Sequence, residues 1–237
     1  MKTKVSNGLE LQILEPAESW DRAMPLYGQI FGPDNDGGLN ILEIFPRNRP
    51  PRIFRNPAWQ AVALVGTALS LEDEEPLPGL VELYRDLHGR DHLAPLLRIL
   101  QERGTPHFYL AYASPPDQMH TLLVPPRRLE LDAAWLSDIL HSVLPCYATD
   151  DRADWGLVID EDTMYLGGEP ELMRRFVAES GGMEELVRIF SLYIVEYVTP
   201  GEQDYDGVAA RFYRRLYTYC GWEWPFPEPP PAPTPEA

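Results

Sequence analysis

The sequence is short of the features by which enzymes are usually identified. It has no glycine-rich phosphate loop, no nucleophile elbow, and no set of histidines and cysteines spaced to bind a metal. It has only two cysteines, Cys146 and Cys220, and no apolar run approaching the roughly 18 residues of a membrane span. These absences leave no motif on which to assign a reaction. They favour a binding protein over an enzyme, and we expect no bound cofactor.

The chain also lacks an apolar leader, because Met1 to Val5 run directly into the polar residues 6–8. With so few cysteines, this predicts a cytoplasmic protein whose two thiols are reduced. Lysine is scarce as well: Lys2 and Lys4 are the only two, and arginine supplies the other basic side chains. This excess of arginine over lysine favours a bacterial source.

What the chain has in excess is acid. Its 37 Asp and Glu residues outnumber its 20 Lys and Arg residues, which gives a formal net charge of −17. Such a field repels the phosphates of nucleic acids and anionic membrane surfaces. It attracts basic proteins and speeds their approach. We therefore expect a basic protein partner, no membrane association and no nucleic acid. The same acidity also serves solubility, which is the simpler interpretation.

The hydrophobic pattern predicts an α+β protein, with short β-hairpins packed against about four to six helices and a helix-rich C-terminal half. We expect an N-terminal α+β half over residues 1–148 and a hairpin followed by helices over 149–224, packed as one globular unit. Residues 225–237 contain seven prolines. They predict a polyproline-type tail, which serves as a spacer or docks on a partner.

Several elements have specific signals. Residues 107–113 and 119–124 predict a hairpin in which Ala113 pairs with Met119, and residues 155–159 and 164–166 predict another. Asp91 is expected to cap a helix that ends at Gly104. Pro170 is expected in the first turn of a helix that runs to about residue 179.

Other segments are less clearly defined. Gly167 and Gly168 are expected to turn the chain. Residues 9–14 predict a strand, whereas 58–69 fit either a buried strand or a short helix. Residues 39–45 could form another strand, and the rest of the first sixty residues looks irregular.

Residues 31–43 resemble part of an EF-hand calcium loop. With Gly37 at the invariant glycine of that loop, Asp34 and Asp36 occupy its third and fifth positions, and Glu43 occupies the twelfth. The segment departs from the pattern at the first ligand position, where Gly32 replaces aspartate. The resemblance implies a metal site at Asp34, Asp36 and Glu43. The alternative is a polar turn.

One segment is basic, since no acid occurs between Glu43 and Glu72. Aromatic residues interleave with its arginines, a pattern that suits phosphates or stacked bases. The alternatives are pairing with acids of the chain itself and recognition of a protein partner. The candidate anion-binding residues are Arg47, Arg49, Arg52 and Arg55.

Two acidic clusters and the aromatic C-terminal part are the candidate partner-binding surface. Acids arranged around rigid aromatic side chains are suited to a basic protein. The same acids also fit solvated loops or a Mg²⁺ site, and Cys146 with His141 is a conceivable nucleophilic pair. The candidate residues are Asp150, Asp151, Asp154, Asp160, Glu161, Asp162, Tyr217, Trp222 and Trp224.

The leading hypothesis is an acidic bacterial protein-binding module of the immunity or antitoxin kind, which inhibits a basic toxin or nuclease. One alternative is an enzyme with a carboxylate-based metal site. The other is a structural or assembly subunit tethered by its proline-rich tail.

Overall fold

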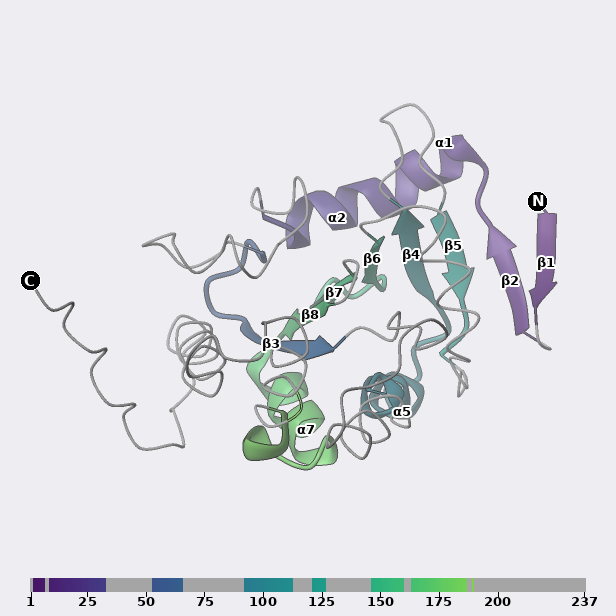
Figure 1. The fold of residues 1–237 in the computed structure, drawn as a ribbon. Coiled ribbons are helices and arrows are strands. Elements are labelled where there is room, and N and C mark those ends of the chain that lie inside the picture. Colours follow the sequence, from purple (N-terminus) through teal and green to yellow (C-terminus); the bar gives the residue numbers. More distant parts are fainter. Residues whose placement is uncertain are drawn as a thin grey trace, which may run out of the picture.

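A computed structural model describes residues 2–6, 9–32, 53–65, 92–112, 121–126, 146–159, 163–186 and 189. The strands are β1 (Lys2–Ser6), β2 (Leu9–Ile13), β3 (Gln60–Val65), β4 (Phe108–Tyr112), β5 (Thr121–Val124), β6 (Cys146–Thr149), β7 (Trp155–Ile159) and β8 (Thr163–Gly168). Within the described residues they form one eight-stranded antiparallel sheet in the order β1-β2-β5-β4-β6-β7-β8-β3 (Figure 1).

Helices cover both faces of this sheet. On one face lies a continuous helical segment made of α1 (Pro16–Glu18), the π-helical turn η1 (Ser19–Ala23) and α2 (Met24–Ile30). On the other face lie α5 (Ala94–Glu102) and α7 (Pro170–Glu179) (Figure 1). Arg98 pairs with Glu179 and Arg175 with Glu102, so ion pairs join the two helices. The sheet is therefore the middle layer of three.

The expected helix-rich architecture is wrong. Within the described residues the protein is mostly sheet with few helices, and strands β7 and β8 of the C-terminal half lie in the sheet rather than beside a helical bundle. The hydrophobic pattern misled the prediction because both faces of the sheet are covered. Every residue of β5 and β7 is buried, so these strands show no alternation of apolar and polar residues. The proposed boundary at residue 148 falls inside β6 and stays a prediction.

The core follows the register of the sheet. Residues opposite one another on neighbouring strands point to the same face, and one such row crosses six strands. Its members are all buried and face the layer of α5 and α7. They are Val62, Leu166, Leu157, Ala148, Leu110 and Leu122.

On the opposite face, two glycines make room for the helical layer. Gly156 of β7 pairs with Gly167 of β8. A Cβ atom at Gly156 would lie 2.6 Å from Cγ2 of Ile30, and one at Gly167 would collide with the ring of Phe54. Phe54 in turn pairs with Phe31 in an isolated antiparallel bridge. The absence of side chains at the two glycines thus lets the end of α2 approach the sheet.

Most element predictions in the described residues are confirmed. The ladder Ala111 to Thr121 has the offset that pairing Ala113 with Met119 requires. Gly104 ends the helix before it with a positive φ of 69°. The predicted strand at 9–14 is β2, and within 58–69 the strand alternative is confirmed over Gln60–Val65, which is β3.

Two local predictions are wrong. The residue that caps α5 is Leu93 rather than Asp91, and it makes no side-chain capping bond. Gly167 and Gly168 belong to strand β8 rather than to a turn. Read from the sequence alone, two consecutive glycines indicate a turn. Here they lie in a strand, where the Phe54 ring approaches Gly167 and the Asp154 carbonyl approaches Gly168 closely.

Candidate functional site

The candidate site is the turn between β6 and β7, residues 150–154, and the segments packed around it. One is the connection between α5 and β4, residues 103–107, and another is the η1 turn. The structure brings Asp150, Asp151 and Asp154 together on this turn, as the sequence suggested. It also gives each of these acids a different set of contacts.

Asp150 closes the turn from inside the protein. It is 1% exposed, and its Oδ1 accepts a hydrogen bond of 2.9 Å from the backbone N–H of Arg152. Its Oδ2 accepts a bond of 3.3 Å from the hydroxyl of Thr105. Its carbonyl accepts one of 3.1 Å from the N–H of Ala153, which adopts a positive φ of 53°. Asp150 thus stabilises the turn, as aspartate side chains commonly do. Because the side chain is buried, its carboxylate is not presented to a partner.

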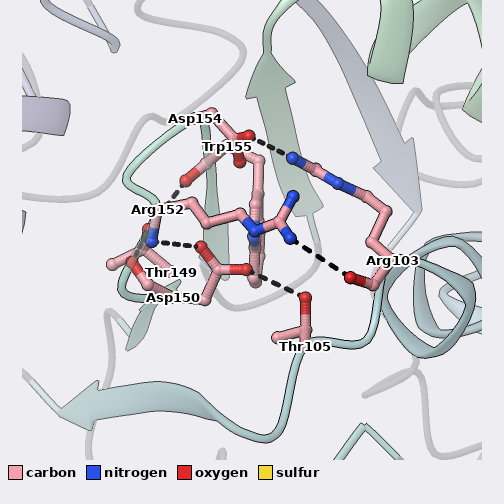
Figure 2. Close-up of polar contacts among 7 residues, drawn as sticks. All are labelled: Arg103, Thr105, Thr149, Asp150, Arg152, Asp154 and Trp155. Atoms are coloured by element: carbon pink, nitrogen blue, oxygen red, sulfur yellow. Dashed lines mark hydrogen bonds and ion pairs between the residues drawn. The ribbon is translucent and has the colours of Figure 1, made fainter.

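Asp154 is held at the other end of the turn. Its carboxylate forms an ion pair with the guanidinium of Arg103, and both side chains are about three-quarters buried (Figure 2). Arg152 crosses the turn, and its Nη2 donates a bond of 3.2 Å to the carbonyl of Arg103. Figure 2 shows these groups gathered around Trp155, with Thr105 at the lower edge of the cluster. The contacts fix the turn to the end of α5.

Asp151 is the most exposed acid of the turn, with a side chain that is 59% exposed. The hydroxyl of Tyr109 donates a bond of 2.6 Å to its Oδ1, and Nε2 of His107 lies 3.3 Å from its Oδ2. Tyr109 lies in β4, and His107 directly precedes that strand. The bond from Tyr109 restrains the carboxylate at the protein surface, which lowers the conformational entropy it would lose on binding a cation.

Tyr109 connects the turn to the helical layer. Its hydroxyl accepts a bond of 3.1 Å from Nη2 of Arg22 in η1, and the Arg22 guanidinium lies 5.7 Å from the centre of its ring. Burial, followed by the bond to Asp151, raises the pKa of Tyr109 to about 12. The phenol therefore stays protonated near neutral pH and remains a donor to Asp151.

Arg55 is the one candidate anion-binding residue among the described residues, and its anion-binding role stays a prediction. Its Nε donates a bond of 2.8 Å to the carbonyl of Phe31, which ties the segment after Phe54 to the end of α2. The side chain is thus engaged with the backbone of the protein itself. The other candidate anion-binding residues, Arg47, Arg49 and Arg52, lie outside the described residues.

The remaining candidates also lie outside the described residues, and their roles stay predictions. For the part that the structure does describe, no three His, Cys, Asp or Glu side chains gather where they could hold a metal ion. The candidates outside are Asp34, Asp36, Glu43, Asp160, Glu161, Asp162, Tyr217, Trp222 and Trp224.

The thiol of Cys146 is a poor nucleophile in this fold. Cys146 is fully buried in β6, it is not part of a disulfide, and burial raises its pKa to about 12. The thiolate is the reactive form of cysteine, so a raised pKa suppresses its chemistry at neutral pH. Its suggested partner His141 lies outside the described residues.

Sequence reasoning missed two residues of this region, Trp20 and Arg22. Both lie in η1, within a stretch that the sequence left irregular. A signal was present: Glu15, Pro16 and Glu18 are typical of a helix start, and the structure shows a capping box between Glu15 and Glu18.

Comparison of the chain with family models, curated proteins and solved structures finds no match. Among the helices of the described residues, none has the length and apolar character needed to cross a membrane.

Proposed function

We propose that this chain is an acidic bacterial protein-binding module that inhibits a basic partner, in the manner of an immunity or antitoxin protein acting on a toxin or nuclease. The observation that carries the proposal is the net charge of −17. A field of this size steers cationic proteins toward the chain and resembles the polyanion that a nuclease binds.

The β6–β7 turn supports this proposal through Asp151. Its carboxylate is largely exposed, and the hydrogen bond from Tyr109 holds it in place. A charged group that is already fixed loses little entropy when it pairs with an arginine or lysine of a partner. Asp150 and Asp154 take part indirectly, because they keep the turn in its observed shape.

The proposed place of action is the cytoplasm. The thiol of Cys146, which is not part of a disulfide, is compatible with a reducing compartment. An inhibitor that protects its own cell would meet its target there.

The test is affinity capture on the immobilised full-length chain from a lysate of its native host, at low and at high salt. We expect a basic protein that is held at low salt and released at high salt, because charge pairs at an interface are screened by ions. The retained protein is then purified, and its activity is assayed as the chain is added. Inhibition that is complete at an equimolar ratio is the expected result.

Two outcomes would contradict the proposal. One is that no basic protein is retained in a salt-dependent way. The other is that the retained protein keeps its full activity when saturated with the chain, because an inhibitor must reduce it. Retention that is unaffected by salt would also argue against a partner selected by charge.

A further inference from the structure

Trp20 is the one large hydrophobic side chain that the described residues leave exposed, at 47%. The helical segment 16–30 buries one side against the sheet through Ser19, Ala23, Tyr27 and Ile30. Trp20 lies beside that stripe rather than within it. The ring of Trp20 therefore offers a large apolar area to a partner.

The backbone around Trp20 is unusual as well. Trp20 lies in η1, a π-helical turn between α1 and α2. Such turns are rare and are frequently found at functional sites. Side-chain contacts hold η1 at two points, since the buried hydroxyl of Ser19 bonds that of Thr121 and Arg22 bonds Tyr109. Trp20 is therefore presented from a rigid support.

The neighbours of Trp20 form a mixed apolar and acidic surface. Pro16, Ala17 and Met24 lie three or four residues from Trp20 and share its side of the helix. Pro16 and Ala17 are exposed, and Met24 is partly buried. The exposed acids Glu18 and Asp21 flank Trp20 on the solvent side of the same turns, and Oε2 of Glu18 also accepts a bond of 3.4 Å from the N–H of Glu15 in the capping box. We call these six residues, Pro16, Ala17, Glu18, Trp20, Asp21 and Met24, the Trp20 face.

The only base in residues 15–24 is Arg22, and its guanidinium is engaged with Tyr109. Arg22 keeps its charge, because Tyr109 is neutral, and it lies four residues after Glu18 and directly after Asp21. With Glu15, the helix start still has three acids against one base, so an exposed tryptophan next to an excess of acid combines an apolar contact with charge selectivity. Tryptophan is among the residues that contribute most at protein interfaces.

We propose that the Trp20 face is the surface on which a basic protein partner docks, with Trp20 inserted into an apolar pocket and Glu18 and Asp21 opposite arginine or lysine. This inference rests on the proposed function and adds the site of contact. Charge complementarity selects the occupant. A second copy of the chain also has a net charge of −17, so it would be repelled, as would a nucleic acid or an anionic membrane.

The probe for the test is the basic protein that the wild-type chain retains in the capture experiment, purified and titrated against full-length variants. Trp20→Ala removes the anchor, and the pair Glu18→Gln and Asp21→Asn removes two charges at nearly constant shape. The control is the pair Glu171→Gln and Glu184→Gln, which removes the same charge at exposed positions outside the Trp20 face. Circular dichroism and thermal melting verify that each variant is folded.

We expect Trp20→Ala to weaken the affinity by about 30-fold, the size typical of a tryptophan that dominates an interface. The Glu18 and Asp21 pair should slow association at low salt by about tenfold and reduce its dependence on salt. The control pair should bind within about twofold of wild type.

The outcomes separate this inference from the function on which it rests. If the wild-type chain retains a basic protein and folded Trp20→Ala binds it with unchanged affinity, the docking face is wrong and the function stands. If no basic protein is retained, the function and the docking face fail together. If sedimentation shows a wild-type dimer that Trp20→Ala dissociates, the face belongs to self-association and the inference is overturned.

Discussion

The hydroxyl of Tyr109 joins the Arg22 guanidinium, 3.1 Å away, to the Asp151 carboxylate, 2.6 Å away. Arg22 lies 87 residues from Tyr109 in the sequence, and Asp151 lies 42 residues from it on the other side. One phenol thus connects the η1 turn, strand β4 and the β6–β7 turn. The Trp20 face and the exposed acid Asp151 are positioned by the same side chain.

Tyr109→Phe should destabilise the protein, because it removes both hydrogen bonds of the phenol and leaves the rest of the ring in place. We expect the free energy of unfolding to fall by about 1–2 kcal/mol, since each bond involves a charged partner but Asp151 and Arg22 are exposed to solvent. Urea denaturation followed by circular dichroism measures the change.

Tyr27→Phe is the matched control. Tyr27 lies on the buried side of α2, and its hydroxyl has no hydrogen-bond partner among the described residues. Removing it eliminates a desolvated polar group, so stability should be unchanged or higher. If Tyr27→Phe costs as much as Tyr109→Phe, the loss reflects the ring environment rather than the bonds to Arg22 and Asp151.

Asp150→Ala should also destabilise the protein, by about 2–3 kcal/mol, because a buried carboxylate that closes the turn is lost and Thr105 and the Arg152 N–H lose their acceptor. Asp150→Asn should cost less, since its amide oxygen can still accept one of these bonds. Chemical denaturation gives both values.

Glu184→Ala, at an exposed position, serves as the control for Asp150 and should stay within about 0.5 kcal/mol of wild type. An Asp150→Ala protein as stable as this control would mean that the turn does not depend on Asp150. In that case the carboxylate would have to be reconsidered as a functional group.

The parts of the fold that could be predicted are those with local signals. Pro170 in the first turn of α7 and the positive φ of Gly181 and Gly182 after its end are set by the chemistry of neighbouring residues. The pairing of β4 with β5 was predictable because two runs of β-forming residues lie close together in the sequence.

The remaining features depend on contacts between distant segments. Strand β6, Cys146–Thr149, has four residues and no periodicity, and it becomes a strand because β4 and β7 flank it in the sheet. For the site, the sequence found the acids of the turn. It did not show that Asp150 would be buried or that Arg22 would reach Tyr109, since pairings across such separations leave no mark in a single sequence.

Glycine substitutions test the close approach of α2 to the sheet. Gly167→Ala would place a methyl group against the ring of Phe54, and Gly156→Ala would place one against Ile30. Both should lower the free energy of unfolding by about 1–3 kcal/mol, the usual cost of overpacking a core. Thermal and urea unfolding provide the measurement.

Gly28→Ala is the matched control for the glycines, because its added methyl group in α2 would meet nothing within 4 Å. Alanine is the better helix former, so we expect a gain of about 0.5–1 kcal/mol. Equal effects at Gly28 and Gly167 would show that steric contact with Phe54 does not set the cost.

The burial of Cys146 predicts a loss of stability in alkali. Its pKa is raised from 9.0 to about 12 in the folded protein, so below pH 9 both the folded and unfolded states carry the proton. Between pH 9 and 12 the unfolded state loses the proton and the folded state keeps it. The free energy of unfolding should therefore fall as pH rises through this range, and Tyr109 acts in the same direction.

Urea unfolding at a series of pH values, with wild type and Cys146→Ala, isolates the thiol. The variant starts from a lower stability because it leaves a cavity, but its stability should fall less steeply above pH 9, since the group that titrates is gone. Parallel curves for the two proteins would contradict a raised pKa at Cys146.

A second measurement reads the same thiol directly. In a Cys220→Ser protein, Cys146 is the only cysteine, and a disulfide reagent should label it about 100-fold more slowly in the native state than in urea, because the reagent needs an accessible thiolate. Rapid labelling of the native protein at neutral pH would show that β6 opens or that the thiol ionises. Either result would reinstate Cys146 as a candidate nucleophile.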